Sequence, residues 1–218
     1  GPIGTPLILS AVLVALAWRS ELWVSIALLI FATNTAYTSR YTWVFAPIIW
    51  FFMLELFDGL QEGENKLRLT QRARFLLWLL TFAGVGGLLF LGLALGAYFQ
   101  WGWAQSLPAV FFKLTSAFGR ASQQPLLWYR LLPNETYHSG ILLGTTITVL
   151  PLMAVLLYQV KSGKWKINHW QKWIIALPLF AFFAVGLIVS TKIGGGGDLH
   201  NMDMFLIGLF LVAVLALY

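Results

Sequence analysis

Residues 75–99 read FLLWLLTFAGVGGLLFLGLALGAYF, an apolar stretch that contains no charged side chain. A transmembrane α-helix needs about 20 consecutive apolar residues, because the hydrocarbon core of a bilayer is about 30 Å thick and each helical residue adds about 1.5 Å. This stretch is therefore the least ambiguous membrane-spanning segment of the chain. Within it, Gly92 and Gly96 form a pair of small residues four positions apart, which allows a second helix to approach closely.

Other apolar stretches predict further membrane-spanning helices on both sides of this one. They cover residues 6–18, 22–36, 42–57, 141–160 and 173–191, and a last one begins near Met204. The first two are short and are separated only by Arg19, Ser20 and Glu21. They form either a tilted hairpin of two spans, which we favour, or one long bent helix in which Arg19 and Glu21 pair at mid-depth.

The composition of the whole chain agrees with a helical bundle in a membrane. Of the 218 residues, 59% are hydrophobic and 10% are charged, against roughly 25% charged in soluble domains. We therefore predict an all-α, polytopic transmembrane helical bundle of about six to seven spans in the cell membrane, forming a single transmembrane domain over residues 1–218. Because the chain starts without Met and stops inside the apolar run 209–218, we expect it to be a fragment of a longer protein.

Two segments are expected to depart from straight, simple spans. Pro47 lies inside the apolar stretch 42–57 and is expected to kink it. Residues 107–120 instead predict one amphipathic helix that lies along the membrane interface. Its apolar side chains recur at helical spacing, at Leu107, Val110, Phe111, Leu114 and Phe118.

The distribution of basic residues predicts the orientation of the bundle. The net charge is +6, but the basic residues lie in short loops between apolar spans, so we expect contacts with membrane lipid and no nucleic-acid partner. Nine Lys and Arg residues follow the first, third and fifth spans, at Arg19, Lys66, Arg68, Arg72, Arg74, Lys161, Lys164, Lys166 and Lys172. Because cytoplasmic loops are enriched in Lys and Arg, these loops are predicted to be cytoplasmic, and residues 100–140 and the loop after Thr191 to face outward.

Residues 192–203, KIGGGGDLHNMD, form the densest polar cluster of the chain. Glycines bring main-chain N–H groups close to a ligand, so Lys192 and this backbone would bind a phosphate. Asp198, His200 and Asp203 are the candidate catalytic residues, because a carboxylate or an imidazole accepts a proton or ligates a divalent metal ion. The candidate substrate-binding residues are Lys192, Gly194, Gly195, Gly196, Gly197, Asn201 and, from another outward loop, His138.

Plainer interpretations of these polar residues also stand. The cluster would equally serve as a turn, with Asn201 or Asp203 as the N-cap of the last helix. Glu55 lies within an apolar span and is either functional or snorkels to the interface beside Asp58. His169 falls in the predicted cytoplasmic linker and is a weak candidate. The chain has no cysteine, which excludes disulfides and thiolate chemistry; the metal, if one binds, is unspecified.

At residues 192–205, and in its Trp-rich outward loops, the chain resembles the membrane part of GT-C-type glycosyltransferases. These are polytopic enzymes that take sugars from lipid-phosphate carriers. The opening Gly1-Pro2-Ile3-Gly4-Thr5-Pro6 is also similar to the Gly-Pro-x-x-x-Pro entry into the second span of some of these proteins. In that register, the first outward loop, which commonly carries the catalytic acid of the family, would lie upstream of residue 1.

The resemblance implies a hexosyl or pentosyl transfer at an outward-facing site. A polyprenyl-phosphate sugar would be the donor, with Lys192 near its phosphate. Asp198, His200 and Asp203 would position the donor, the acceptor or a divalent metal ion.

Two other classes of function fit the same sequence. A non-catalytic subunit of a membrane complex, structural or associated with a pigment or cofactor, would suit the abundance of Phe and Trp and would have partner subunits. The three histidines of this chain, however, all lie in predicted loops rather than in the middle of a span. A transporter would show inverted repeats and polar groups at mid-membrane, and the sequence has no convincing repeat.

Overall fold

The computed structural model describes residues 5–39, 43–63, 66–69, 74–75, 126–135, 138–192 and 199–217. The chain divides into two compact units, Gly1–Leu69 with Leu127–Tyr218, and Thr70–Leu126. The described residues fall almost entirely in the first unit. Apart from Phe75, the expected span at 75–99 lies outside the described residues, as does the expected interfacial helix at 107–120. The single transmembrane domain stays a prediction.

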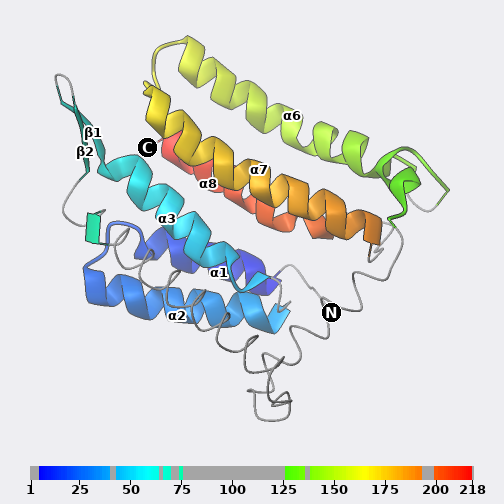
Figure 1. Ribbon diagram of the computed structural model, residues 1–218, viewed down its shortest axis with the longest axis horizontal. Helices are drawn as coiled ribbons and strands as arrows, with labels where there is room; N and C mark the ends of the chain where they lie inside the picture. The colour runs from blue at the N-terminus through cyan, green and yellow to red at the C-terminus, as the bar shows by residue number, and fades with distance from the viewer. Residues whose placement is uncertain are drawn as a thin grey trace, which may run out of the picture. The chain divides into compact units, whose positions relative to one another are not determined.

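The first unit is a bundle of six described α-helices (Figure 1). They are α1 (Thr5–Ala17), α2 (Leu22–Ser39), α3 (Ala46–Gly59), α6 (Gly140–Lys161), α7 (His169–Lys192) and α8 (Asp203–Leu217), with short 3-10 helices η3 (Trp128–Leu131) and η4 (His200–Met202). By length and composition, four stretches of these helices are able to cross a membrane: Leu22–Ser39, Gly140–Lys161, His169–Thr191 and His200–Leu217. The prediction of a multi-pass helical membrane protein is confirmed to that extent.

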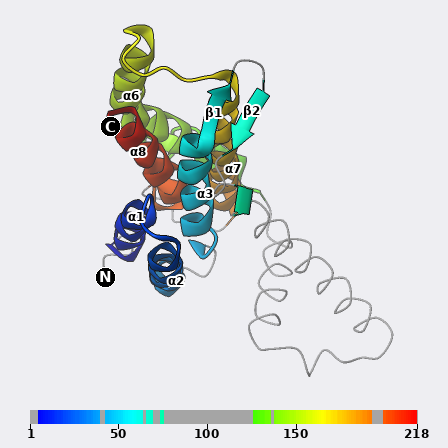
Figure 2. The same cartoon turned by 90° about the vertical axis from the view of Figure 1, so that its left-hand side faces the viewer.

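Helices α1 and α2 form the predicted hairpin rather than one bent helix. They lie side by side (Figure 2), and the turn between them places Arg19 at a positive φ of 67°. The buried Ser10 Oγ donates to Ala32 O at 2.7 Å, and Ser25 Oγ donates to Ala17 O at 2.7 Å. Hydroxyl groups that bond to carbonyls across two helices hold them together where lipid offers no alternative partner.

One end of the bundle gathers the turns that follow α1, α3 and α6; we call residues 18–21, 58–60 and 161–169 the basic end. Arg19 Nε donates to Asp58 Oδ2 at 2.7 Å, and Gln171 Nε2 donates to Phe57 O at 3.1 Å. The ring of Phe57 also packs on the ring of Trp165, with the centroids 5.9 Å apart. The three loops predicted to share the cytoplasmic side therefore meet at one end, as far as they are described.

Glu55 is buried near the end of α3 and contacts the turn between α1 and α2. Its side chain is 7% exposed, and its Oε1 accepts from the backbone N–H of Arg19 at 3.4 Å. The carboxylate therefore holds the turn between α1 and α2 against α3. Glu55 therefore does more than snorkel to the interface, because its carboxylate bonds to Arg19 in the turn between α1 and α2.

Helix α3 differs from its prediction at the start. The expected kink at Pro47 is wrong, because the helix begins at Ala46 and Pro47 lies in its first turn. Proline fits there, since the first N–H groups of a helix have no partner within the helix. Two later prolines, Pro151 and Pro178, do lie inside α6 and α7.

Trp50 joins α3 to the two helices that carry the candidate site. Its side chain is fully buried, and its Nε1 donates to Met204 O at 3.2 Å. Its ring meets the edge of Phe182 on α7, with the centroids 6.2 Å apart. A Cβ placed on Gly208 would lie 3.0 Å from Trp50 Nε1, so the glycine is needed for this close approach.

The segment after α3 contains a small β-hairpin that the sequence did not predict. Strands β1 (Leu60–Gly63) and β2 (Lys66–Leu69) pair antiparallel, with Leu60 opposite Leu69 and Gly63 opposite Lys66. It is the only sheet among the described residues. Two short strands add little stability by themselves, so the all-α class holds for the bundle.

The arrangement of the helices predicts that His138 and Ser162, at opposite ends of α6, face opposite sides of the membrane. Both are exposed, and the chain has no cysteine to interfere. The variants His138→Cys and Ser162→Cys are expected to react with a membrane-impermeant maleimide from opposite sides of sealed vesicles. Labelling of both variants from the same side would contradict the position of α6 as a complete span.

Candidate functional site

The polar cluster predicted at 192–203 follows the last turn of α7 and leads into α8. Helix α7 ends at Lys192. Leu199 directly precedes η4, which leads into α8. A Cβ on Gly186 would lie 2.7 Å from Met202 Sδ and 2.9 Å from Asn201 O. The glycine therefore lets η4 pack against α7, which places residues 199–204 beside the end of that helix.

The structure places only part of the predicted site. His200 and Asn201 lie in η4, and Asp203 is the first residue of α8 rather than the residue before it. Asn201 is 5% exposed, whereas the side chains of His200 and Asp203 are half-buried. Asp198 and the four glycines Gly194, Gly195, Gly196 and Gly197 lie outside the described residues, and Lys192 is placed only as the end of α7.

A second segment meets this end of the bundle. The backbone N–H of Leu127 donates to Thr191 O at 3.0 Å, so the chain before η3 is attached to the last turn of α7. Helix α6 then starts at Gly140 with a φ of +65°, and a Cβ there would lie 2.3 Å from the carbonyl carbon of Leu132. We call residues 127–135 and 138–145, the last turn of α7 and residues 199–204 the His200 end.

His138 belongs to the same end, as the sequence predicted. It lies two residues before α6 and is exposed. The candidate residues His138, His200 and Asp203 therefore come from two separate stretches of sequence but occupy one end of the bundle. This end could bind a polar ligand through imidazole and carboxylate groups.

Three further polar residues at the His200 end were not predicted from the sequence as candidates. They are Arg130 on η3, Thr145 on α6 and Ser190 on α7, and in each a side-chain nitrogen or oxygen is buried without a hydrogen-bond partner. Thr145 and Ser190 are each 4% exposed. Isolated polar residues in an apolar sequence give no pattern, so the one available signal was their position near the ends of predicted spans.

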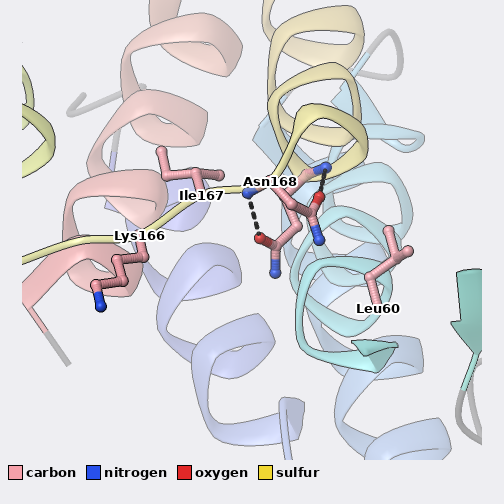
Figure 3. Close-up of a pocket in the computed structure, with 5 residues that line it drawn as sticks. Leu60, Lys166, Ile167 and Asn168 are labelled. Atoms are coloured by element: carbon pink, nitrogen blue, oxygen red, sulfur yellow. Dashed lines mark hydrogen bonds between the residues drawn. The ribbon is translucent and has the colours of Figure 1, made fainter. Parts of the chain in front are cut away.

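A cavity lies at the opposite, basic end. Its volume is about 260 Å³, and it is lined by Leu60, Lys166, Ile167, Asn168 and Gln171 (Figure 3). The backbone N–H of Gln171 donates to Asn168 Oδ1 at 2.8 Å, and the N–H of Asn168 donates to Gln171 Oε1 at 3.0 Å. This reciprocal pair caps the start of α7. Among the described residues, the lining consists of one lysine, two side-chain amides and two aliphatic side chains.

His169 is not in a linker, as the sequence suggested, but is the first residue of α7. Its Nε2 accepts from Trp173 Nε1 at 3.0 Å, which occupies a nitrogen that would otherwise ligate a metal or a pigment. No histidine of the chain is found in the middle of a helix, since His138 precedes α6 and His200 lies in η4. Among the described residues no group of three potential metal ligands comes together.

Comparison of the chain with models of known families, with characterised proteins and with solved structures finds no match.

Proposed function

We propose that this chain is the membrane part of a glycosyltransferase-like protein that uses a polyprenyl-phosphate-linked sugar at an outward-facing site. The observation that carries the proposal is the convergence of His200, Asn201 and Asp203 with residues 127–135 and 138–140 at the end of the bundle opposite the basic end. A lipid-linked donor would reach such a site from the bilayer, with its phosphate at the level of the helix ends.

The proposal also includes the full span count of six to seven. Helices α1 and α3 have 13 and 14 residues, or about 20 Å each at 1.5 Å per residue. Tilting cannot lengthen them, so the bilayer would have to thin locally around them. With the apolar stretch 75–99 and the four longer helices, they complete seven spans.

In the proposed reaction, an acceptor hydroxyl oxygen bonds to the anomeric carbon of the sugar while the bond from that carbon to the lipid-phosphate oxygen breaks. The phosphate leaves with the electron pair, and the hydroxyl proton passes to a base. Asp198, His200 and Asp203 would position donor and acceptor, directly or through a divalent metal ion, and Lys192 would stabilise the charge on the leaving phosphate.

The triple variant Asp198→Asn, His200→Ala, Asp203→Asn tests this role. We expect it to lower sugar transfer from a polyprenyl-phosphate sugar by about 100-fold, the lower range for losing positioned acid–base groups. Glu135→Gln is the matched control, because Glu135 is an exposed carboxylate at the same end. Transfer at the unmodified rate by a triple variant that is folded in membranes would remove these residues from the mechanism.

The alternative of a pigment-associated subunit is less well supported by the described residues. An axial ligand within a span requires a histidine in mid-helix, and all three histidines lie at helix starts or between helices. An absorption spectrum of the purified protein with a visible cofactor band would favour this alternative over the transferase.

A further inference from the structure

The His200 end contains polar atoms that are buried and lack a partner within the protein. Arg130 Nη1, Thr145 Oγ1 and Ser190 Oγ are all removed from solvent, and none of them has a hydrogen bond. A buried polar group without a partner costs about 1–3 kcal/mol, and more if it is charged. Three such groups at one end of a bundle are expected where a ligand supplies the missing bonds.

Backbone hydrogen bonds bring Arg130 close to the end of α7. Leu127 N–H donates to Thr191 O at 3.0 Å, and Arg130 N–H donates to Leu127 O at 3.1 Å. The backbone of Arg130 is therefore two hydrogen bonds away from Thr191. Since Ser190 directly precedes Thr191, the backbones that carry the Arg130 guanidinium and the Ser190 hydroxyl lie close together.

Ser190 also lies on the side of α7 that faces the candidate site. Leu179, Phe182, Gly186 and Ser190 are buried at helical spacing along one face, and Gly186 is the residue against which Asn201 and Met202 pack. Ser190 is one turn beyond Gly186, toward the glycine-rich loop. Its hydroxyl therefore belongs to the part of α7 that meets η4.

Thr145 lies on α6, a second helix that contacts η3. It lies in the second turn of α6, whose first residue, Gly140, packs against the backbone of Leu132. Leu132 follows η3 directly, so both α6 and α7 contact the short helix that carries Arg130. Three separate elements that meet at η3 thus carry one guanidinium and two hydroxyl groups at the same end of the bundle.

We propose that Arg130, Thr145 and Ser190 form a binding site for the phosphate group of a polyprenyl phosphate. A guanidinium donates two parallel hydrogen bonds to a phosphate, and the two hydroxyl groups supply further donors. Arg130 forms no ion pair with a carboxylate in the part of the chain that the structure describes. This inference rests on the proposed function and identifies residues that hold the donor's phosphate.

Binding to the full-length protein in nanodiscs tests the site, with a polyprenyl monophosphate, the corresponding polyprenol and inorganic phosphate as probes. The polyprenyl monophosphate is expected to bind, and polyprenol to bind at least tenfold more weakly. Arg130→Gln is expected to weaken binding of the phosphate by about 10- to 100-fold, and Arg130→Lys by less. Lys164→Gln is the control, because it removes one positive charge at the basic end.

Ser190→Ala separates a binding role from a structural one. Because Ser190 Oγ has no partner in the protein, its removal is expected to leave the melting temperature of the ligand-free protein unchanged or slightly raised. The same variant is expected to weaken binding of the polyprenyl monophosphate several-fold. A lowered melting temperature with unchanged binding would assign Ser190 to the fold and overturn its part in the site.

The remaining outcomes also decide the proposal. Equal binding of polyprenol, or binding that does not respond to Arg130→Gln, would overturn the site. Inorganic phosphate that binds as tightly as the lipid would show a site for the free anion and overturn the lipid assignment. If sugar transfer is absent but binding is intact and depends on Arg130, only the transferase proposal is contradicted. If the Arg130→Gln variant transfers sugar at the normal rate, only the phosphate site is contradicted.

Discussion

Replacing Trp50 with alanine is expected to lower the free energy of unfolding by about 3 kcal/mol. Trp50 is fully buried where α3, α7 and α8 meet, so its removal leaves a cavity and takes away the hydrogen bond from its Nε1 to Met204 O. Such changes cost about 3–5 kcal/mol in soluble cores. We take the lower end because a chain unfolded within a bilayer keeps its apolar contacts with lipid.

Two variants isolate the parts of this effect. Trp50→Phe keeps an aromatic ring beside Phe182 but removes the indole N–H, and is expected to cost about 1 kcal/mol. Trp23→Ala removes the same side chain from a position that is 78% exposed, and is expected to cost close to nothing. Reversible unfolding in mixed micelles, followed by circular dichroism, measures all three. Equal losses for Trp50→Ala and Trp23→Ala would contradict the buried contact between the three helices.

Replacing Gly140 with alanine is expected to have an effect of similar size, about 3 kcal/mol, by a different cause. Its φ of +65° costs an L-residue about 1–2 kcal/mol. The added Cβ would also lie 2.3 Å from the carbonyl carbon of Leu132, and relieving such a contact typically costs a further 1–3 kcal/mol. Either Gly140 or the backbone of residues 132–133 must shift, so ligand binding at the His200 end should fall together with stability.

Gly163 provides the matched control for this prediction. Its φ is +71°, but a Cβ there would meet nothing within 4 Å. Gly163→Ala is therefore expected to cost only the backbone strain, about 1 kcal/mol. The difference between the two variants, measured by the same unfolding assay, gives the cost of the contact with Leu132. No difference would mean that residues 132–133 do not pack against the start of α6.

The longer helices were predictable because continuous apolar sequence defines them. The expected span 141–160 is found as Gly140–Lys161, and the expected span 173–191 as His169–Lys192. The earlier start of α7 follows from the reciprocal hydrogen bonds of Asn168 and Gln171. This asparagine and glutamine three residues apart are a polar capping signal that hydropathy alone does not detect.

The hairpin of α1 and α2 could not be decided from hydropathy, because both alternatives bury the same apolar residues. Contacts distant in sequence decide between them. Ser10 bonds to Ala32, and Arg19 bonds to Asp58 in the last turn of α3. The start of α3 was misjudged for a related reason, since Pro47 is compatible with a kink or with a first turn until the neighbouring helices are known.

The candidate site was predictable in its position and only partly in its residues. Density of polar side chains identified residues 192–203, and His138 was assigned to the same end by counting spans. Arg130 lies in the predicted outward segment 100–140, and the burial of its Nη1 depends on how η3 packs against α6 and α7. The burial of Arg130 results from the packing of η3, α6 and α7, so the sequence pattern around Arg130 does not predict it.

The hairpin of α1 and α2 also bears on how the protein enters the membrane. Helix α1 has 13 residues, too few to span the hydrocarbon core unaided, and its buried Ser10 hydroxyl finds its acceptor on α2. During synthesis, α1 would therefore leave the translocon together with α2, as a preformed pair, rather than partition into lipid first. The hydrogen bond from Ser10 to the carbonyl of Ala32 would in this way couple the insertion of α1 to that of α2.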